Sequence, residues 1–205
     1  MANHKQSYIY KNLSLYRFLM LVTSFGSYFK EFDIIFSLLP SKTSSVLELC
    51  FADTYLAMLC RKNNIAWTRY DISKRFVDNA KRKNYSAFQA DLHNIKFKSH
   101  YDVTIISRSL YQFKSDLHDF IYTVLEASDS IIICETIKSF SNSKVSFFRW
   151  LAKKLTHSGD LEHVFRYNKE SIESEIESIQ SKFNLKMVKR VSNSNTIFYL
   201  LQKDI

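Results

Sequence analysis

Carboxylates stand at the ends of three consecutive apolar runs in the first half of the chain. Glu48 lies in SVLELC, Asp71 ends IAWTRYD and Asp91 ends YSAFQAD. If these runs are parallel strands, their carboxyl ends meet at one edge of a sheet, which is where such sheets bind ligands. Asp71 follows Glu48 by 23 residues, and an acid at the end of a second strand can accept hydrogen bonds from both hydroxyls of a ribose. One strand-end acid is usually a solvated turn residue, but three in succession favour a binding site.

The elements that would position these acids alternate between strand and helix. Strands are expected at 45–50, 65–71, 85–91, 101–107 and 130–136, and helices at 53–62, 73–83 and 115–127. Ser73 and Asn168 can act as helix caps, the latter for a last helix that contains Ile172, Ile176, Ile179 and Phe183. The chain closes with LKMVKRV and NTIFYLLQK around SNSN, which indicates a hairpin. This order predicts an α/β three-layer sandwich with a seven-stranded, mostly parallel sheet and a reversed C-terminal strand.

The first 40 residues are expected to form a separate N-terminal helical cap. Apolar residues within 8–39 recur at helical spacing, and Pro40 followed by SKTSS ends this part. The most hydrophobic stretch, 13–29, contains Arg17 and Gly26 and falls short of the ~20 apolar residues of a membrane span. Packing as a lid is favoured, and peripheral contact with a membrane surface is the alternative.

The composition bounds the function without identifying it. The 205 residues are 46% hydrophobic and carry a net charge of +9, which suits one domain and attracts anions such as nucleic acid. The Lys and Arg residues are spread along the chain, so a compositional bias is favoured over a nucleic-acid partner. Three cysteines without metal-ligand spacing, and no secretory signal, predict reduced thiols, no metal and a cytoplasmic location. The oligomeric state stays open.

Together these residues resemble a class I S-adenosylmethionine-dependent methyltransferase from about residue 44 to the end. Five stretches carry the resemblance: VLELCFADTYLA, YDIS, QADLHNIKF, YDVTIISRSLYQF and DLEHVFRYNKESIESEIESI. The resemblance implies a Rossmann-like methyltransferase fold over 41–205 and S-adenosyl-L-methionine as the cofactor. It implies that Asp71 holds the ribose and that Ile72 contacts the adenine. It also implies that Asp91 meets the edge of the adenine and that Leu92 meets its face. The cofactor-binding residues that it implies are Glu48, Ala52, Asp53, Asp71, Ile72, Asp91, Leu92 and Ser107.

The first motif departs from the family pattern. Family glycines would fall near Cys50, Ala52 and Thr54, and a variant of the family with ELCFGD keeps the middle one, here Ala52. Glycine serves there because the backbone approaches the cofactor and adopts φ > 0 in some cases. The added methyl group of Ala52 is expected to weaken cofactor binding rather than abolish it.

Methyl transfer is an in-line displacement in which proximity and orientation supply much of the acceleration. A base is needed only where the acceptor must lose a proton, and the candidates are His163, Tyr167 and Tyr111. His163 falls in an acceptor-side loop by resemblance, with a surface histidine as the alternative, and Tyr111 is equally explained as a packing aromatic.

The sequence therefore predicts methyl transfer to a small-molecule or sugar-type acceptor. The alternative is a catalytically degenerate protein of this fold that serves as a binding or scaffold partner. A nucleic-acid methyltransferase is less favoured, because SRSLYQF lacks the proline of amino-methylating enzymes. Cys134, the candidate nucleophile of a cytosine-modifying enzyme, lies in an apolar run typical of a buried thiol.

Overall fold

The computed structural model describes residues 17–18, 20–21, 26–51, 53–137 and 165–204. The helices are α2 (Tyr28–Ser37), α3 (Tyr55–Lys62), α4 (Lys74–Lys81), α5 (Leu117–Ala127) and α7 (Lys169–Phe183), with short 3₁₀ turns η2 (Leu92–Asn94) and η3 (Leu110–Phe113). The strands are β1 (Ser45–Leu49), β2 (Ala66–Asp71), β3 (Ser86–Gln89), β4 (Tyr101–Ser107), β5 (Ser128–Thr136), β6 (Leu185–Ser192) and β7 (Thr196–Lys203).

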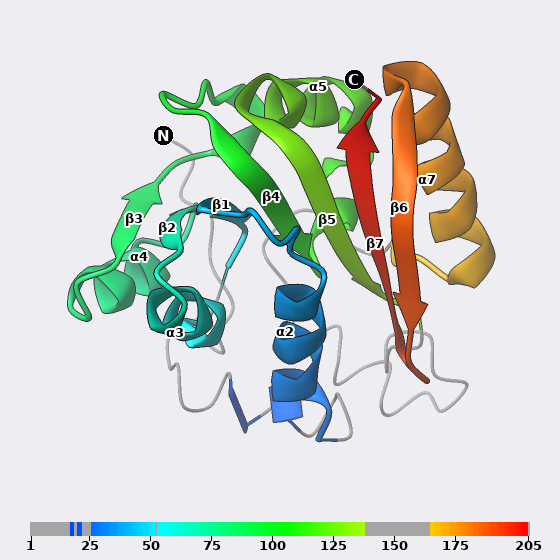
Figure 1. Cartoon of the computed structure of the whole chain (residues 1–205). Coiled ribbons are helices and arrows are strands. Elements are labelled where there is room, and N and C mark those ends of the chain that lie inside the picture. The colour runs from blue at the N-terminus through cyan, green and yellow to red at the C-terminus, as the bar shows by residue number, and fades with distance from the viewer. Residues whose placement is uncertain (1–16, 19, 22–25, 52, 138–164, 205) are drawn as a thin grey trace.

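One seven-stranded sheet in the order β3-β2-β1-β4-β5-β7-β6 forms the middle layer (Figure 1). The five strands from β3 to β5 pair in parallel, whereas β7 runs antiparallel to both β5 and β6. The predicted seven-stranded, mostly parallel sheet with a reversed C-terminal strand is therefore confirmed. Its strand order reverses direction between β1 and β4, the place where open sheets of this kind form a ligand crevice.

Each face of the sheet buries its own apolar core. Side chains of α5 and α7 pack with Leu47, Leu49, Ile106 and Ile133 on one face. Side chains of α2 and α3 pack with Val46, Ile105, Ile132 and Leu200 on the other face. Because side chains alternate along a strand, the nearly continuous apolar runs in the centre of the sheet supply both cores. The three-layer prediction is confirmed by this arrangement (Figure 1).

The predicted helix starts differ in their details. Asn168 caps α7 as expected, in a capping box with Ser171. Ser73 stands at the N-cap of α4, but its side chain makes no capping bond there. The third strand ends earlier than predicted, because Asp91 turns to cap η2 by accepting from the His93 amide. The helix expected over 144–155, and most of the first helix expected within 8–26, lie outside the described residues.

Candidate functional site

A cavity of about 200 Å³ lies at the carboxyl ends of β1, β2, β3 and β4. Its walls come from the residues that follow these strands, together with Tyr28 and Phe32 of α2. Seven of the predicted site residues line it: Glu48, Asp71, Ile72, Asp91, Leu92, Ser107 and Tyr111. The parallel sheet thus brings together side chains that are far apart in the sequence.

Of the other four predicted residues the structure describes two, Tyr167 and Asp53, and neither lines the cavity. Ala52 and His163 lie outside the described residues, so their roles stay predictions. Tyr167 is 1% exposed and packs in the core beneath α5 and α7, where burial raises the pKa of its hydroxyl. Asp53 is buried beside the cavity rather than in its lining.

The carboxylate of Asp53 is used within the protein. It accepts two bonds from Arg17, from Nε at 2.6 Å and from Nη2 at 2.9 Å. It also accepts from the backbone amides of Thr54 and Tyr55 at the start of α3. With its oxygens bonded in this way, Asp53 fastens the turn after β1 to the N-terminal segment.

Asp71 is the acid best placed to meet a ligand from the end of β2. It lines the cavity, and its Oδ1 accepts from the Ser73 amide at 2.6 Å. Burial raises the pKa of Asp71 to about 7, while the Ser73 amide and Arg69 oppose the rise. The carboxylate is therefore poised between its two protonation states near neutral pH.

Glu48 is 2% exposed and lies at the floor of the same cavity. Its Oε2 accepts from Nε1 of Trp67 at 3.0 Å. Burial raises the pKa of Glu48, and the positive charge of Arg69 opposes this effect.

An apolar wall stands next to Asp71. Ile72 is 52% exposed although it is a large aliphatic residue, and Leu92 is buried in the same lining. Exposed apolar surface beside buried acids suits a flat ligand that has one apolar face and one polar edge. The predicted contacts of Ile72 and Leu92 with adenine require apolar surface of this kind beside polar groups.

The backbone at the cavity adopts left-handed conformations directly after two neighbouring strands. Cys50 follows β1 with φ of 53°, and Arg108 follows β4 with φ of 56°. Residues with a Cβ rarely adopt this region, which favours glycine. Cys50 is the first of the three positions at which glycine is expected, and its backbone adopts the left-handed conformation. Both residues also line the cavity.

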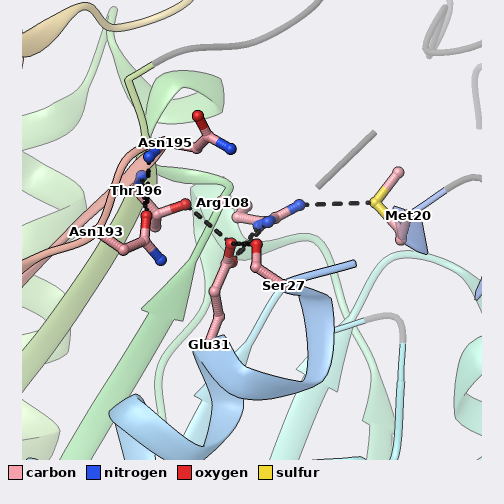
Figure 2. Close-up of polar contacts among 7 residues, drawn as sticks. All are labelled: Met20, Ser27, Glu31, Arg108, Asn193, Asn195 and Thr196. Carbon is pink, nitrogen blue, oxygen red and sulfur yellow. Dashed lines mark hydrogen bonds and ion pairs between the residues drawn. The ribbon is translucent and has the colours of Figure 1, made fainter. Parts of the chain in front are cut away.

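Arg108 is held by a buried carboxylate of α2 (Figure 2). Its Nε and Nη2 donate to Oε2 of Glu31 at 2.9 and 2.5 Å, and Glu31 is 3% exposed. The other oxygen of Glu31 accepts from Thr196 of β7 at 2.9 Å and from Ser27. Asn193 in turn accepts from the amide of Thr196, so the network joins α2, β4 and the closing hairpin (Figure 2).

Tyr111 lies on the turn that follows β4. The guanidinium of Arg166 stands 3.7 Å from its ring centre, and burial raises the pKa of the Tyr111 hydroxyl. Glu135 at the end of β5 holds this turn by accepting from the Leu110 amide at 2.6 Å. Burial raises the pKa of Glu135 to about 7. Glu135 is not part of the cavity lining; it fixes the backbone of the turn that carries Tyr111.

The sequence analysis missed a histidine–carboxylate pair at the edge of the cavity. Nδ1 of His93 lies 2.7 Å from Oδ2 of Asp116, and the His93 ring packs 5.0 Å from that of Phe113. When Nδ1 carries the proton it donates to Asp116, and Nε2 is left as an acceptor. The two partners are 23 positions apart and gave no sequence signal, because only the fold brings the start of α5 to η2.

Three further features bear on other functions: the buried thiol of Cys134, metal-ligand clusters and membrane-spanning helices. The Cys134 thiol is fully buried and burial raises its pKa, which opposes a role as nucleophile. Within the described part of the chain, no group of three His, Cys, Asp or Glu side chains is arranged to hold a metal ion. The same residues include no helix with the length and apolar character needed to cross a membrane.

No family model and no curated protein matches the sequence. Solved structures match the fold. An O-methyltransferase family protein from Burkholderia thailandensis gives a TM-score of 0.66 at 14% identity, over 93% of this chain and 59% of that one. The chain spans only 54% and 59% of the length of two O-methyltransferases that it resembles.

Two further structures agree in most of their length. The N-methyltransferase NodS from Bradyrhizobium japonicum, with S-adenosyl-L-homocysteine, gives a TM-score of 0.60 at 13% identity, over 87% of this chain and 88% of that one. An rRNA methylase from Escherichia coli gives 0.55 at 14% identity, over 96% and 70%. The chain therefore has the α/β Rossmann-like fold of the class I S-adenosylmethionine-dependent methyltransferases.

Proposed function

We propose that the protein transfers a methyl group from S-adenosyl-L-methionine to a small-molecule or sugar-type acceptor. One observation carries the proposal: a single cavity, at the reversal of strand order, gathers Glu48, Asp71, Ile72, Leu92 and Ser107. These are the residue types that such a cofactor needs: carboxylates for hydroxyl and cationic groups, and apolar side chains for a purine.

The cavity suits the cofactor in three respects. Buried carboxylates favour a ligand that carries a positive charge and hydroxyl donors. The apolar wall of Ile72 and Leu92 suits the face of a purine. The Ser73 hydroxyl is buried in the lining without a hydrogen-bond partner among the described residues, so a ligand can satisfy it.

Each residue then has a physical role. When bound, the cofactor supplies an activated methyl group on a sulfonium centre. Asp71, held in position by its bond from the Ser73 amide, would accept hydrogen bonds from the ribose hydroxyls. Ile72 and Leu92 would pack on the adenine, and Asp91 would meet its edge. Glu48 would supply negative charge for the cationic end of the cofactor.

The acceptor end of the cavity lies toward β4 and α2. Tyr28, Phe32, Arg108 and Tyr111 line it on the side away from Asp71 and Asp91 in the strand order. An acceptor that must lose a proton requires a base. Tyr111, which lines this side of the cavity, is the predicted candidate for this role.

The test is a calorimetric titration of the protein with S-adenosyl-L-methionine. Saturable binding is expected, and Asp71→Ala should weaken it by about 1.5–3 kcal/mol through loss of the ribose hydrogen bonds. Asp119→Ala removes an exposed acid of α5, outside the cavity lining, and should leave the affinity unchanged.

Two results would count against this function. Equal affinity of the Asp71→Ala variant and the parent would remove Asp71 from the site. No binding at millimolar cofactor would favour the degenerate binding protein instead.

A further inference from the structure

A fully buried arginine lies directly behind the two cavity acids. Arg69 is 0% exposed and is the largest of the fully buried side chains. In the sheet it is the register partner of Glu48, and it stands two residues before Asp71 on β2. Because side chains alternate along strands, these three residues share one face of the sheet.

The same guanidinium supports the turn that lacks its glycines. Nη1 of Arg69 donates to the Asp53 carbonyl at 3.0 Å, and Nη2 donates to the Phe76 carbonyl of α4 at 3.1 Å. Its Cζ lies 2.8 Å from the ring centre of Phe51. One side chain thus contacts Phe51 and Asp53 of the segment after β1 and bonds to the Phe76 carbonyl of α4.

The charge of Arg69 acts on the acids in front of it. Burial raises the pKa of Glu48 and of Asp71, and the attraction of Arg69 opposes both shifts. The burial of Arg69 lowers its own pKa, while the acids raise it. The other titratable groups that face this cluster are Asp53 with its partner Arg17, together with Cys50, Cys60, Lys83 and Tyr85.

Packing alone does not explain a charge at this position. Replacing buried ionic groups by apolar side chains of similar volume is often neutral or stabilising, and the rings of Phe51 and Trp67 already pack against this one. A methionine would fill the space without the cost of desolvation.

We propose that Arg69 is a positioning residue of the cofactor site: it braces the turn after β1 through its bonds to the Asp53 and Phe76 carbonyls, and its charge favours the ionised forms of Asp71 and Glu48. The inference rests on the proposed function, since it assigns these acids to cofactor binding. Arg69 does not touch the ligand in this account; it acts through the acids and through Asp53.

The experiment is a titration with S-adenosylhomocysteine between pH 5.5 and 8.5, on the parent and on Arg69→Met and Arg69→Lys. Affinity of the parent should rise with pH around pH 7, as Asp71 ionises. Arg69→Met removes the positive charge, so the pH at which the affinity is half-way through its rise should move up by about one pH unit; we call this pH the midpoint. At pH 7 its affinity should fall at least roughly fivefold, because the ionised fraction drops from about one half to about one tenth and the bonds to Asp53 and Phe76 are lost as well.

The lysine variant separates charge from hydrogen bonding. Arg69→Lys keeps the charge but cannot reproduce the paired bonds to Asp53 and Phe76, so its affinity should fall at every pH with the midpoint unchanged. Arg61→Met is the matched control, because Arg61 also donates to two carbonyls and stacks on a ring, that of Tyr85, but is exposed on α3. It should leave both the affinity and the midpoint as in the parent.

An unchanged midpoint in Arg69→Met would overturn the inference. If Arg69→Met does not fold, Arg69→Gln serves as the neutral variant, with the same expected shift. If the parent itself binds no cofactor, the proposed function fails, and ¹³C carboxyl NMR still tests Arg69. The Asp71 titration should then move upward in the neutral variant, and an unmoved titration would contradict the role of Arg69.

Discussion

At the residue scale, the backbone of Cys50 carries the cost of the glycine-poor turn. Its φ of 53° places a side chain in a region that disfavours a Cβ by about 1–2 kcal/mol. Burial raises the pKa of its thiol, so the residue offers no thiolate in return. The sequence identifies Cys50, Ala52 and Thr54 as residues in place of glycines, but it does not show that Cys50 adopts a positive φ.

Cys50→Gly should therefore stabilise the protein. The left-handed backbone becomes permissible, partly offset by the greater freedom of glycine in the unfolded chain, for a net gain of up to about 1 kcal/mol. Urea denaturation measures the free energy of unfolding. Cys50→Ala is the control, since it removes the thiol but keeps the Cβ, and it should show no gain. Equal stability of the two variants would mean that the backbone at Cys50 is not strained.

The sequence predicted the two acids of the cavity but not the buried arginine beside them. Asp71 and Glu48 were predicted because acids at strand ends are conspicuous. Arg69 was not, because an arginine within IAWTRYD is ordinarily assigned to solvent. Its phase, two residues before Asp71 and two after Trp67, was the available signal that it points to the same buried face.

At the element scale, α2 is joined to the cavity by one buried ion pair. Its apolar spacing predicted the helix, and Phe32 and Ile35 pack in the core. Glu31 also faces inward, where it pairs with Arg108 at the end of β4 (Figure 2). Periodicity could not reveal this partner, because Arg108 lies 77 residues away in the sequence.

Removing this carboxylate should loosen α2 from the sheet. Glu31→Ala removes the carboxylate that accepts two bonds from the guanidinium of Arg108 at a largely buried position, which costs about 3 kcal/mol of the free energy of unfolding. Glu173→Ala breaks the half-exposed pair with Arg190 and should cost less than about 1 kcal/mol. Chemical denaturation of both variants checks the contrast, and similar losses would contradict a special role for Glu31.

At the scale of the whole molecule, alternation of strands and helices predicted the sheet correctly. Parallel strands with right-handed crossovers leave few arrangements, and the closing hairpin could add only at an edge. The pairing of His93 with Asp116, and the fastening of Asp53 by Arg17, depend on how helices and turns meet in space. Such contacts follow from tertiary packing, so local patterns carry no trace of them.

The central claim is that the cavity at the carboxyl edge of this sheet holds the cofactor. A crystal structure with S-adenosylhomocysteine at millimolar concentration tests it most directly. The account predicts electron density in this cavity, with the ribose hydroxyls within hydrogen-bond distance of Asp71 and the adenine between Ile72 and Leu92. A ligand bound elsewhere, or an empty cavity at that concentration, would contradict it.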